Sequence, residues 1–101
     1  MADYFVVENA WGPRWDTSIG RRQQKGWDEH AKFMDSLVDE GVIVLGGPLG
    51  DVNGVKTLLI CKVKDEAEIR ARLGEDPWSG TMLVIDSVQP WTVWLRAKAP
   101  V

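Results

Sequence analysis

The stretch from Val55 to Lys64, V-K-T-L-L-I-C-K-V-K, constrains the fold more than any other part of the chain. Successive residues of an extended strand point to opposite faces. One face of this stretch carries Leu58 and Ile60, flanked by lysines, and the other carries Val55, Thr57, Leu59, Cys61 and Val63. Because both faces are apolar at the centre, we expect a strand that is covered on both sides.

Three other stretches have the β-branched and aromatic composition that is typical of strands. They are Tyr4–Asn9, Val42–Leu45 and Leu83–Leu95. The last stretch contains Pro90, which cannot donate to a sheet ladder and therefore requires a bulge or an edge position.

Two stretches predict helices. Apolar residues recur at helical spacing from Trp27 to Glu40, and Gly41 should end that helix. A second helix should follow the capping pattern of Asp65 and Glu68 and end at Gly74. Between the first strand and the first helix, residues 10–26 form a long connection with four basic residues: Arg14, Arg21, Arg22 and Lys25.

The predicted order of elements is β-α-β-β-α-β, which is the ferredoxin-like arrangement of the α+β class, an antiparallel sheet with two helices on one face. The 101 residues suffice for one compact domain, residues 1–101, with a real core. Two helices leave the other apolar face of the sheet uncovered. A second copy packed sheet against sheet would cover it, so we expect a homodimer.

Composition excludes several classes of function. The net charge is −3 and no basic block is present, so we expect no nucleic-acid partner. No apolar run approaches the roughly 20 residues that span a bilayer, and the stretch M-A-D-Y-F-V-V-E-N lacks the basic region of a signal peptide, so we expect no membrane partner. The single cysteine, Cys61, excludes an internal disulfide, favours a cytoplasmic location, and is expected to be a buried structural thiol.

His30 is the only histidine in the chain. It precedes Phe33 and Met34 by three and four residues, so it lies on or beside the stripe that faces the core. An imidazole can serve as acid or base at neutral pH, which makes His30 a candidate catalytic residue. The alternative is a helix-start histidine that lies beside Trp27 and is satisfied by the backbone.

Asp76 is the candidate partner of His30. A carboxylate that accepts a hydrogen bond from one ring nitrogen fixes the tautomer and leaves the other nitrogen free to move a proton. The alternative role for Asp76 is a helix N-cap, with Pro77 at the first helical position. Both roles are compatible because a carboxylate has two oxygens.

The spacing of several short motifs carries a family resemblance. His30 begins a helix that leads to Asp39-Glu40-Gly41 and a short apolar strand closing in Gly47-Pro48. Asp76-Pro77 is followed by an aromatic residue, Trp78, and then by a final strand with a proline near its end. On these motifs nearly the whole chain resembles the YciI-like, or YCII-related, proteins.

The resemblance implies a single YCII-related domain that pairs into a dimeric α+β barrel. It also implies that His30 and Asp76 occupy the positions regarded as the active-site pair of that family. Most family members have no assigned substrate, and one relative is a dehydrochlorinase acting on a chlorinated hydroxyquinol. Many members carry an arginine three residues before the histidine, where this chain has Trp27.

The sequence therefore predicts a small enzyme that uses a His30–Asp76 pair for elimination, isomerisation or hydrolysis of a small aromatic or carbonyl compound. Aromatic rings, glycine backbone and a basic side chain suit such a substrate. The residues expected to bind it are Arg14, Trp27, Gly47, Pro48, Trp78 and Ser79. Two alternatives stay open on the same fold: a non-catalytic ligand-binding or accessory domain, and a monooxygenase-like relative.

We expect neither a metal nor a cofactor. One histidine and one cysteine cannot supply the three or four ligands that a zinc site usually takes. The glycine-rich stretch L-G-G-P-L-G-D-V-N-G lacks the lysine and hydroxyl residue of a phosphate loop and is interpreted as turns. Ser36, Ser79 and Ser87 are candidate serine nucleophiles, but each of these is expected to be a turn or cap residue instead.

Overall fold

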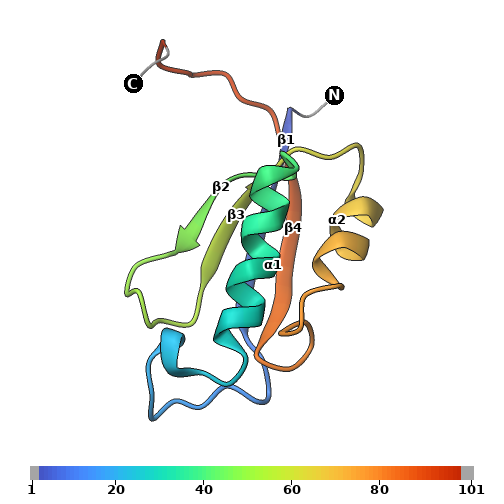
Figure 1. The fold of residues 1–101 in the computed structure, drawn as a ribbon. Coiled ribbons are helices and arrows are strands. Elements are labelled where there is room, and N and C mark those ends of the chain that lie inside the picture. The colour runs from blue at the N-terminus through green and yellow to red at the C-terminus, as the bar shows by residue number, and fades with distance from the viewer. Residues whose placement is uncertain (1–2, 99–101) are drawn as a thin grey trace.

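The computed structural model describes residues 3–98, which form an α+β domain (Figure 1). The strands are β1 (Tyr4–Trp11), β2 (Ile43–Pro48), β3 (Thr57–Cys61) and β4 (Leu83–Trp91). The helices are α1 (Trp27–Asp39) and α2 (Glu66–Leu73), and a single 3₁₀ turn, η1 (Arg21–Gln23), precedes α1. The predicted βαββαβ order and the ferredoxin-like class are confirmed.

The four strands form one antiparallel sheet in the order β2-β3-β1-β4, and both helices lie on the same face of it (Figure 1). Side chains from the strands and from both helices share one buried core on that face: Val7, Leu37, Val42, Ile43, Leu59, Cys61, Ile69 and Leu73. Within residues 3–98, no helix has the length and apolar character needed to cross a membrane.

The central strand has the two-sided character that the sequence predicts, but it is shorter. It spans Thr57–Cys61 rather than Val55–Lys64, with its core-facing residues buried and Leu58 and Ile60 half-buried. β2 is longer than expected because Gly46, Gly47 and Pro48 continue to pair with β3. The prediction that this glycine-rich stretch forms turns is therefore wrong at Gly46, Gly47 and Pro48.

The last strand ends earlier than predicted, at Trp91 instead of Leu95. Its only neighbour, β1, begins at Tyr4 opposite Trp91, so no strand is available to pair with the residues beyond. Pro90 lies on this edge strand, as expected. Residues 92–98 leave the body of the domain (Figure 1), and Trp94 and Leu95 are 89% and 93% exposed.

The helix ends follow the predicted signals. Gly41 has a φ of 78°, and the amides of Gly41 and Val42 donate to the carbonyls of Val38 and Leu37. This is a Schellman motif, in which glycine adopts the left-handed conformation at lowest cost. Asp65 caps α2 by accepting a hydrogen bond from the amide of Glu68 at 2.9 Å.

An ion pair joins the two helices. Glu40, just past the end of α1, accepts hydrogen bonds from Arg72 Nη2 of α2 at 2.9 and 3.0 Å. The arginine supplies a positive partner for a carboxylate at a helix C-terminus, where the helix dipole disfavours negative charge. The ends of α1 and α2 are therefore held together over the sheet.

Candidate functional site

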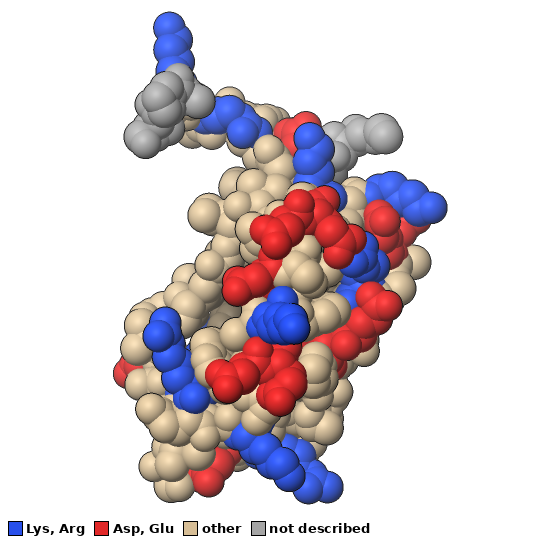
Figure 2. Space-filling model, in the orientation of Figure 1, with Lys and Arg blue, Asp and Glu red and all other residues tan. Residues whose placement is uncertain are grey.

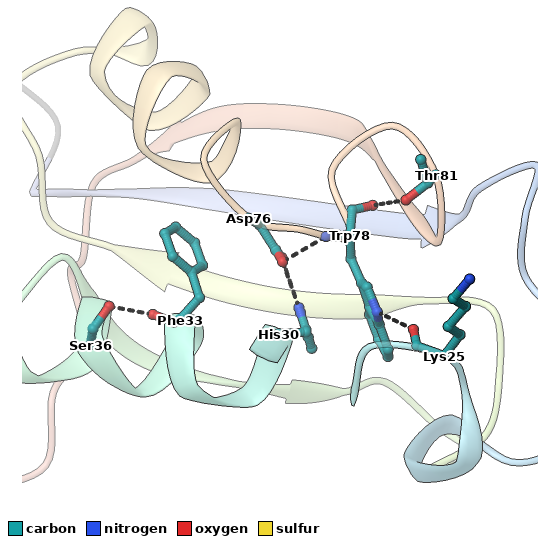
Figure 3. A network of polar contacts seen from close by, with 7 residues as sticks. All are labelled: Lys25, His30, Phe33, Ser36, Asp76, Trp78 and Thr81. Atoms are coloured by element: carbon teal, nitrogen blue, oxygen red, sulfur yellow. Dashed lines mark hydrogen bonds and ion pairs between the residues drawn. The ribbon is translucent and has the colours of Figure 1, made fainter. Parts of the chain in front are cut away.

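His30 and Asp76 are 46 residues apart in the sequence and in direct contact in the structure (Figure 3). His30 is in the first turn of α1, and Asp76 follows α2. The imidazole Nδ1 lies 2.8 Å from Oδ2 and 3.0 Å from Oδ1, and both residues are buried. Because a carboxylate only accepts hydrogen bonds, Nδ1 carries the hydrogen and donates it.

Asp76 is fixed by its own turn. Its Oδ1 also accepts a hydrogen bond from the Trp78 amide at 2.9 Å, and its carbonyl accepts one from the Ser79 amide at 2.9 Å (Figure 3). Residues 76–80 form a turn and no helix follows Pro77, so the expected helix N-cap is wrong. The carboxylate caps a turn instead, and it does so while holding His30.

Trp78 provides a flat surface against the imidazole. The two rings are stacked with their centroids 4.0 Å apart and an interplanar angle of 8°. Trp78 is 2% exposed, and its indole Nε1 donates to the carbonyl of Lys25 at 2.8 Å. Gly26 has a φ of 80°, and a Cβ there would lie 3.2 Å from Trp78 Nε1. A glycine is thus required where the chain enters α1 beside the indole.

The connection before α1 packs against Trp78. The ring of Trp15 meets Trp78 edge to face at 5.8 Å. Gln24, which is buried, holds the connection in shape because its side chain bonds both the amide and the carbonyl of Asp16, at 3.0 and 2.7 Å. Residues 10–26 therefore belong to the candidate site, a role that the sequence left open.

One cavity in the described part of the chain has a volume of about 640 Å³, and we name it the main cavity. Residues of η1, α1, β2 and the core-facing side of the sheet line it, and His30 is among them. Its volume suits a small organic ligand. With Nδ1 bound to Asp76, Nε2 is the ring nitrogen left for a ligand, and Nε2 has no hydrogen-bond partner among residues 3–98.

The predicted substrate-binding residues divide among three spaces. Trp27, Gly47 and Pro48 line the main cavity with His30. Arg14 and Trp78 line a second hollow of about 610 Å³. Ser79 lies with Asp76 at a space of about 20 Å³, which is large enough for little more than one water molecule.

Two polar residues of the main cavity were missed from the sequence. Asn9 and Thr57 are buried, lie opposite each other on β1 and β3, and line the main cavity. Neither side chain has a hydrogen-bond partner among residues 3–98. The available signal was a polar residue at a core-facing position of each strand, where alternation predicts an apolar one.

The described site pairs an imidazole with a carboxylate, a combination that can transfer protons. The hydroxyl of Ser36 donates to the Phe33 carbonyl at 2.5 Å, and no serine hydroxyl in residues 3–98 bonds to His30 (Figure 3). Burial raises the pKa of the Cys61 thiol to about 11, so it stays protonated at neutral pH and has the structural character expected of it. In the described part of the chain, no three His, Cys, Asp or Glu side chains gather into a possible metal site.

Comparison with known protein families, with curated proteins and with solved structures found no match to this chain. The resemblance to the YciI-like proteins therefore rests on the motifs around His30 and Asp76 and stays a prediction.

Proposed function

We propose that this chain is a small cofactor-independent enzyme of the YciI-like type, in which His30 is the general acid and base and Asp76 orients it. The observation that carries the proposal is the buried hydrogen-bonded pair of His30 Nδ1 and the Asp76 carboxylate, with His30 on the wall of the main cavity. This arrangement leaves a lone pair on Nε2 for substrate. The substrate class is a small aromatic or carbonyl compound.

The chemistry begins when Nε2 takes a proton from a carbon or hydroxyl group that a neighbouring carbonyl or ring activates. The Asp76 carboxylate and the face of Trp78 both stabilise the positive ring that results. Return of the proton to a different carbon completes an isomerisation. Departure of a leaving group completes an elimination, and abstraction from a water molecule starts a hydrolysis.

We further propose that the enzyme is a cytoplasmic homodimer. The sheet face opposite the helices carries six apolar side chains around the polar Glu8 and Ser87: Val6, Ala10, Leu45, Leu58, Ile60 and Val84. Leu45 is 70% exposed beside Ile60, its partner on β3. A large exposed apolar patch on a protein surface usually marks an interaction site, and a second copy offers an identical patch.

The test is a screen for proton transfer across a panel of compounds, which works before the substrate has been identified. Small carbonyl and phenolic compounds are incubated with the protein in D₂O, and NMR follows the exchange of C–H for C–D and the formation of products. We expect His30→Gln to lower the rate at least a hundredfold, because glutamine can still bond Asp76 but cannot take a proton. Arg70→Gln is the control for a surface substitution, since Arg70 is exposed on α2 and pairs with Glu66.

Turnover that survives His30→Gln would contradict the proposal. Saturable binding without exchange or product would favour the ligand-binding domain, and oxygen consumption would favour the monooxygenase-like alternative.

A further inference from the structure

Arg21 carries a buried charge that has no carboxylate partner among residues 3–98. It is 7% exposed, and no acidic oxygen of residues 3–98 lies within 4.0 Å of its guanidinium, whereas Arg70 and Arg72 form ion pairs with glutamates. Arg21 Nε donates to the Val52 carbonyl at 3.1 Å, and Nη2 donates to the Gly54 carbonyl at 2.9 Å. These bonds leave the Nη1 hydrogens without a partner in the described residues.

Such a charge is costly to bury. The carbonyl dipoles and the ring of Trp15, whose centroid is 4.9 Å from the guanidinium carbon, offset part of the lost hydration. They supply no net negative charge, and burial lowers the pKa of the Arg21 guanidinium, which still remains protonated at neutral pH. An anion that pairs with Arg21 would recover the remaining cost.

Arg21 lines the main cavity together with His30. The lining also includes Arg22, whose guanidinium carbon lies 5.8 Å from the Trp27 ring centroid, and one carboxylate among the described residues, that of the exposed Asp35. Two arginines against one aspartate make this lining positive in a chain whose net charge is −3. Figure 2 shows acidic side chains gathered over α1 and α2, with lysine and arginine side chains among them.

The rest of the lining suits a flat organic molecule. Trp27, Met34 and Leu59 supply apolar surface, and the amide of Asn9 and the hydroxyl of Thr57 are free to bond polar substituents. A guanidinium binds a carboxylate through two parallel hydrogen bonds, which sets the plane of the bound group.

We propose that the main cavity binds a small planar organic anion, an aromatic or conjugated carboxylate, with Arg21 as its counter-ion and Asn9 and Thr57 as its polar contacts. This names the substrate class of the acid/base site, and it rests on the proposed function only for the part that His30 plays. The binding itself stands on the charge and position of Arg21.

The first test uses benzoate and benzamide, which share a shape and differ in charge. The protein is titrated with each at neutral pH while NMR follows the tryptophan indoles and the ring of His30. We expect benzoate to bind at least tenfold more tightly than benzamide and to shift the signals of Trp27 and His30. Equal affinities, or no binding of benzoate, would overturn the proposal.

Variants then identify the arginine that binds the anion. Arg21→Gln should reduce benzoate affinity at least tenfold, whereas Arg70→Gln, which removes one positive charge on α2, should leave it unchanged. A loss on Arg14→Gln in place of Arg21→Gln would put the anion in the second hollow and overturn the proposal. If Arg21→Gln fails to fold because it loses its bonds to Val52 and Gly54, the benzoate and benzamide comparison on the unaltered protein decides.

The two proposals fail separately. Benzoate binding to the His30→Gln variant reports on Arg21 without any chemistry. If the His30→Gln variant binds benzoate more tightly than benzamide but retains turnover in the D₂O screen, the acid/base role of His30 is contradicted and the anion site is supported. If turnover depends on His30 but benzoate and benzamide bind alike, only the anionic substrate class falls.

Discussion

Asp76 holds two different groups with one carboxylate, and this double role determines what a change at the residue would do. Oδ1 serves the Trp78 amide as well as His30, while Oδ2 serves His30 alone. The sequence suggested the pairing with His30 and a cap at the start of a helix. The structure shows the pairing and a cap on a turn, because the chain after Pro77 folds back towards β4 and does not continue as a helix.

Replacing Asp76 by asparagine should reverse the tautomer of neutral His30. The amide oxygen will stay on the Trp78 amide because the NH₂ group cannot accept a hydrogen bond. The NH₂ group then faces His30 Nδ1, which must accept, so the ring hydrogen moves to Nε2. Long-range ¹H–¹⁵N NMR correlations of the imidazole will measure this, and the single histidine removes any ambiguity of assignment. The same tautomer in both proteins would contradict the assigned hydrogen bond.

The buried thiol of Cys61 makes stability depend on pH in the alkaline range. Its pKa is raised by burial from 9.0 to about 11, so above pH 9 the unfolded chain loses this proton while the folded chain retains it. The free energy of unfolding therefore falls as the pH rises from 9 towards 11, by about 3 kcal/mol in total from this group. Urea unfolding at several pH values should show this decline, and Cys61→Ala should remove that share of it. Parallel pH profiles for the two proteins would refute the assignment.

At the scale of elements, the site depends on how the turn after α2 packs against the end of β1. Gly12 allows the two segments to approach closely. Its amide donates to the Met82 carbonyl at 2.8 Å, and a Cβ at this position would collide with the Thr81 carbonyl oxygen. The periodicity of the sequence predicted the strands and helices, but it did not predict this close approach. Nothing in the local pattern around Gly12 indicates that residues 81 and 82 will lie against it.

Gly12→Ala should therefore destabilise the fold by about 3 kcal/mol, since backbone on both sides must shift to admit the methyl group. Gly47→Ala is the matched control, because a Cβ at Gly47 meets no atom within 4 Å, and its cost should stay within about 0.5 kcal/mol. Thermal unfolding gives both values. Near-ultraviolet circular dichroism should report a looser Trp78 in the first variant only. Equal stability of the two variants would contradict the close packing of Gly12 against residues 81 and 82.

At the scale of the whole molecule, the sequence predicted the sheet face that the helices leave bare, because the apolar residues on both faces of the central strand require two coverings. It did not predict how the connection before α1 is anchored beside the main cavity. Arg21, which lines that cavity, bonds to the carbonyls of Val52 and Gly54, which are 31 and 33 residues further along the chain, and no short motif encodes this contact.

Dimerisation through the bare face predicts a scattering mass of about twice 11.3 kDa at micromolar concentration. Leu45→Lys places a charge on the edge strand β2, at the most exposed of the apolar side chains of the proposed interface, and should convert the protein to monomers. Ile19→Lys adds the same charge at an exposed position of the connection and should leave the dimer intact. A monomeric unaltered protein would rule out this account of the second sheet face.

The strand order β2-β3-β1-β4 has a consequence for how the chain reaches its native state. Cut between β2 and β3, the chain gives two βαβ-type halves, one with His30 and the other with Asp76. Every pair of neighbouring strands joins one half to the other, so neither half contains a hydrogen-bonded strand pair of its own. The strands of the two halves alternate across the sheet. Folding must therefore close distant contacts before either half is stable, which favours slow, all-or-none folding, and the His30–Asp76 contact forms only once both halves have come together.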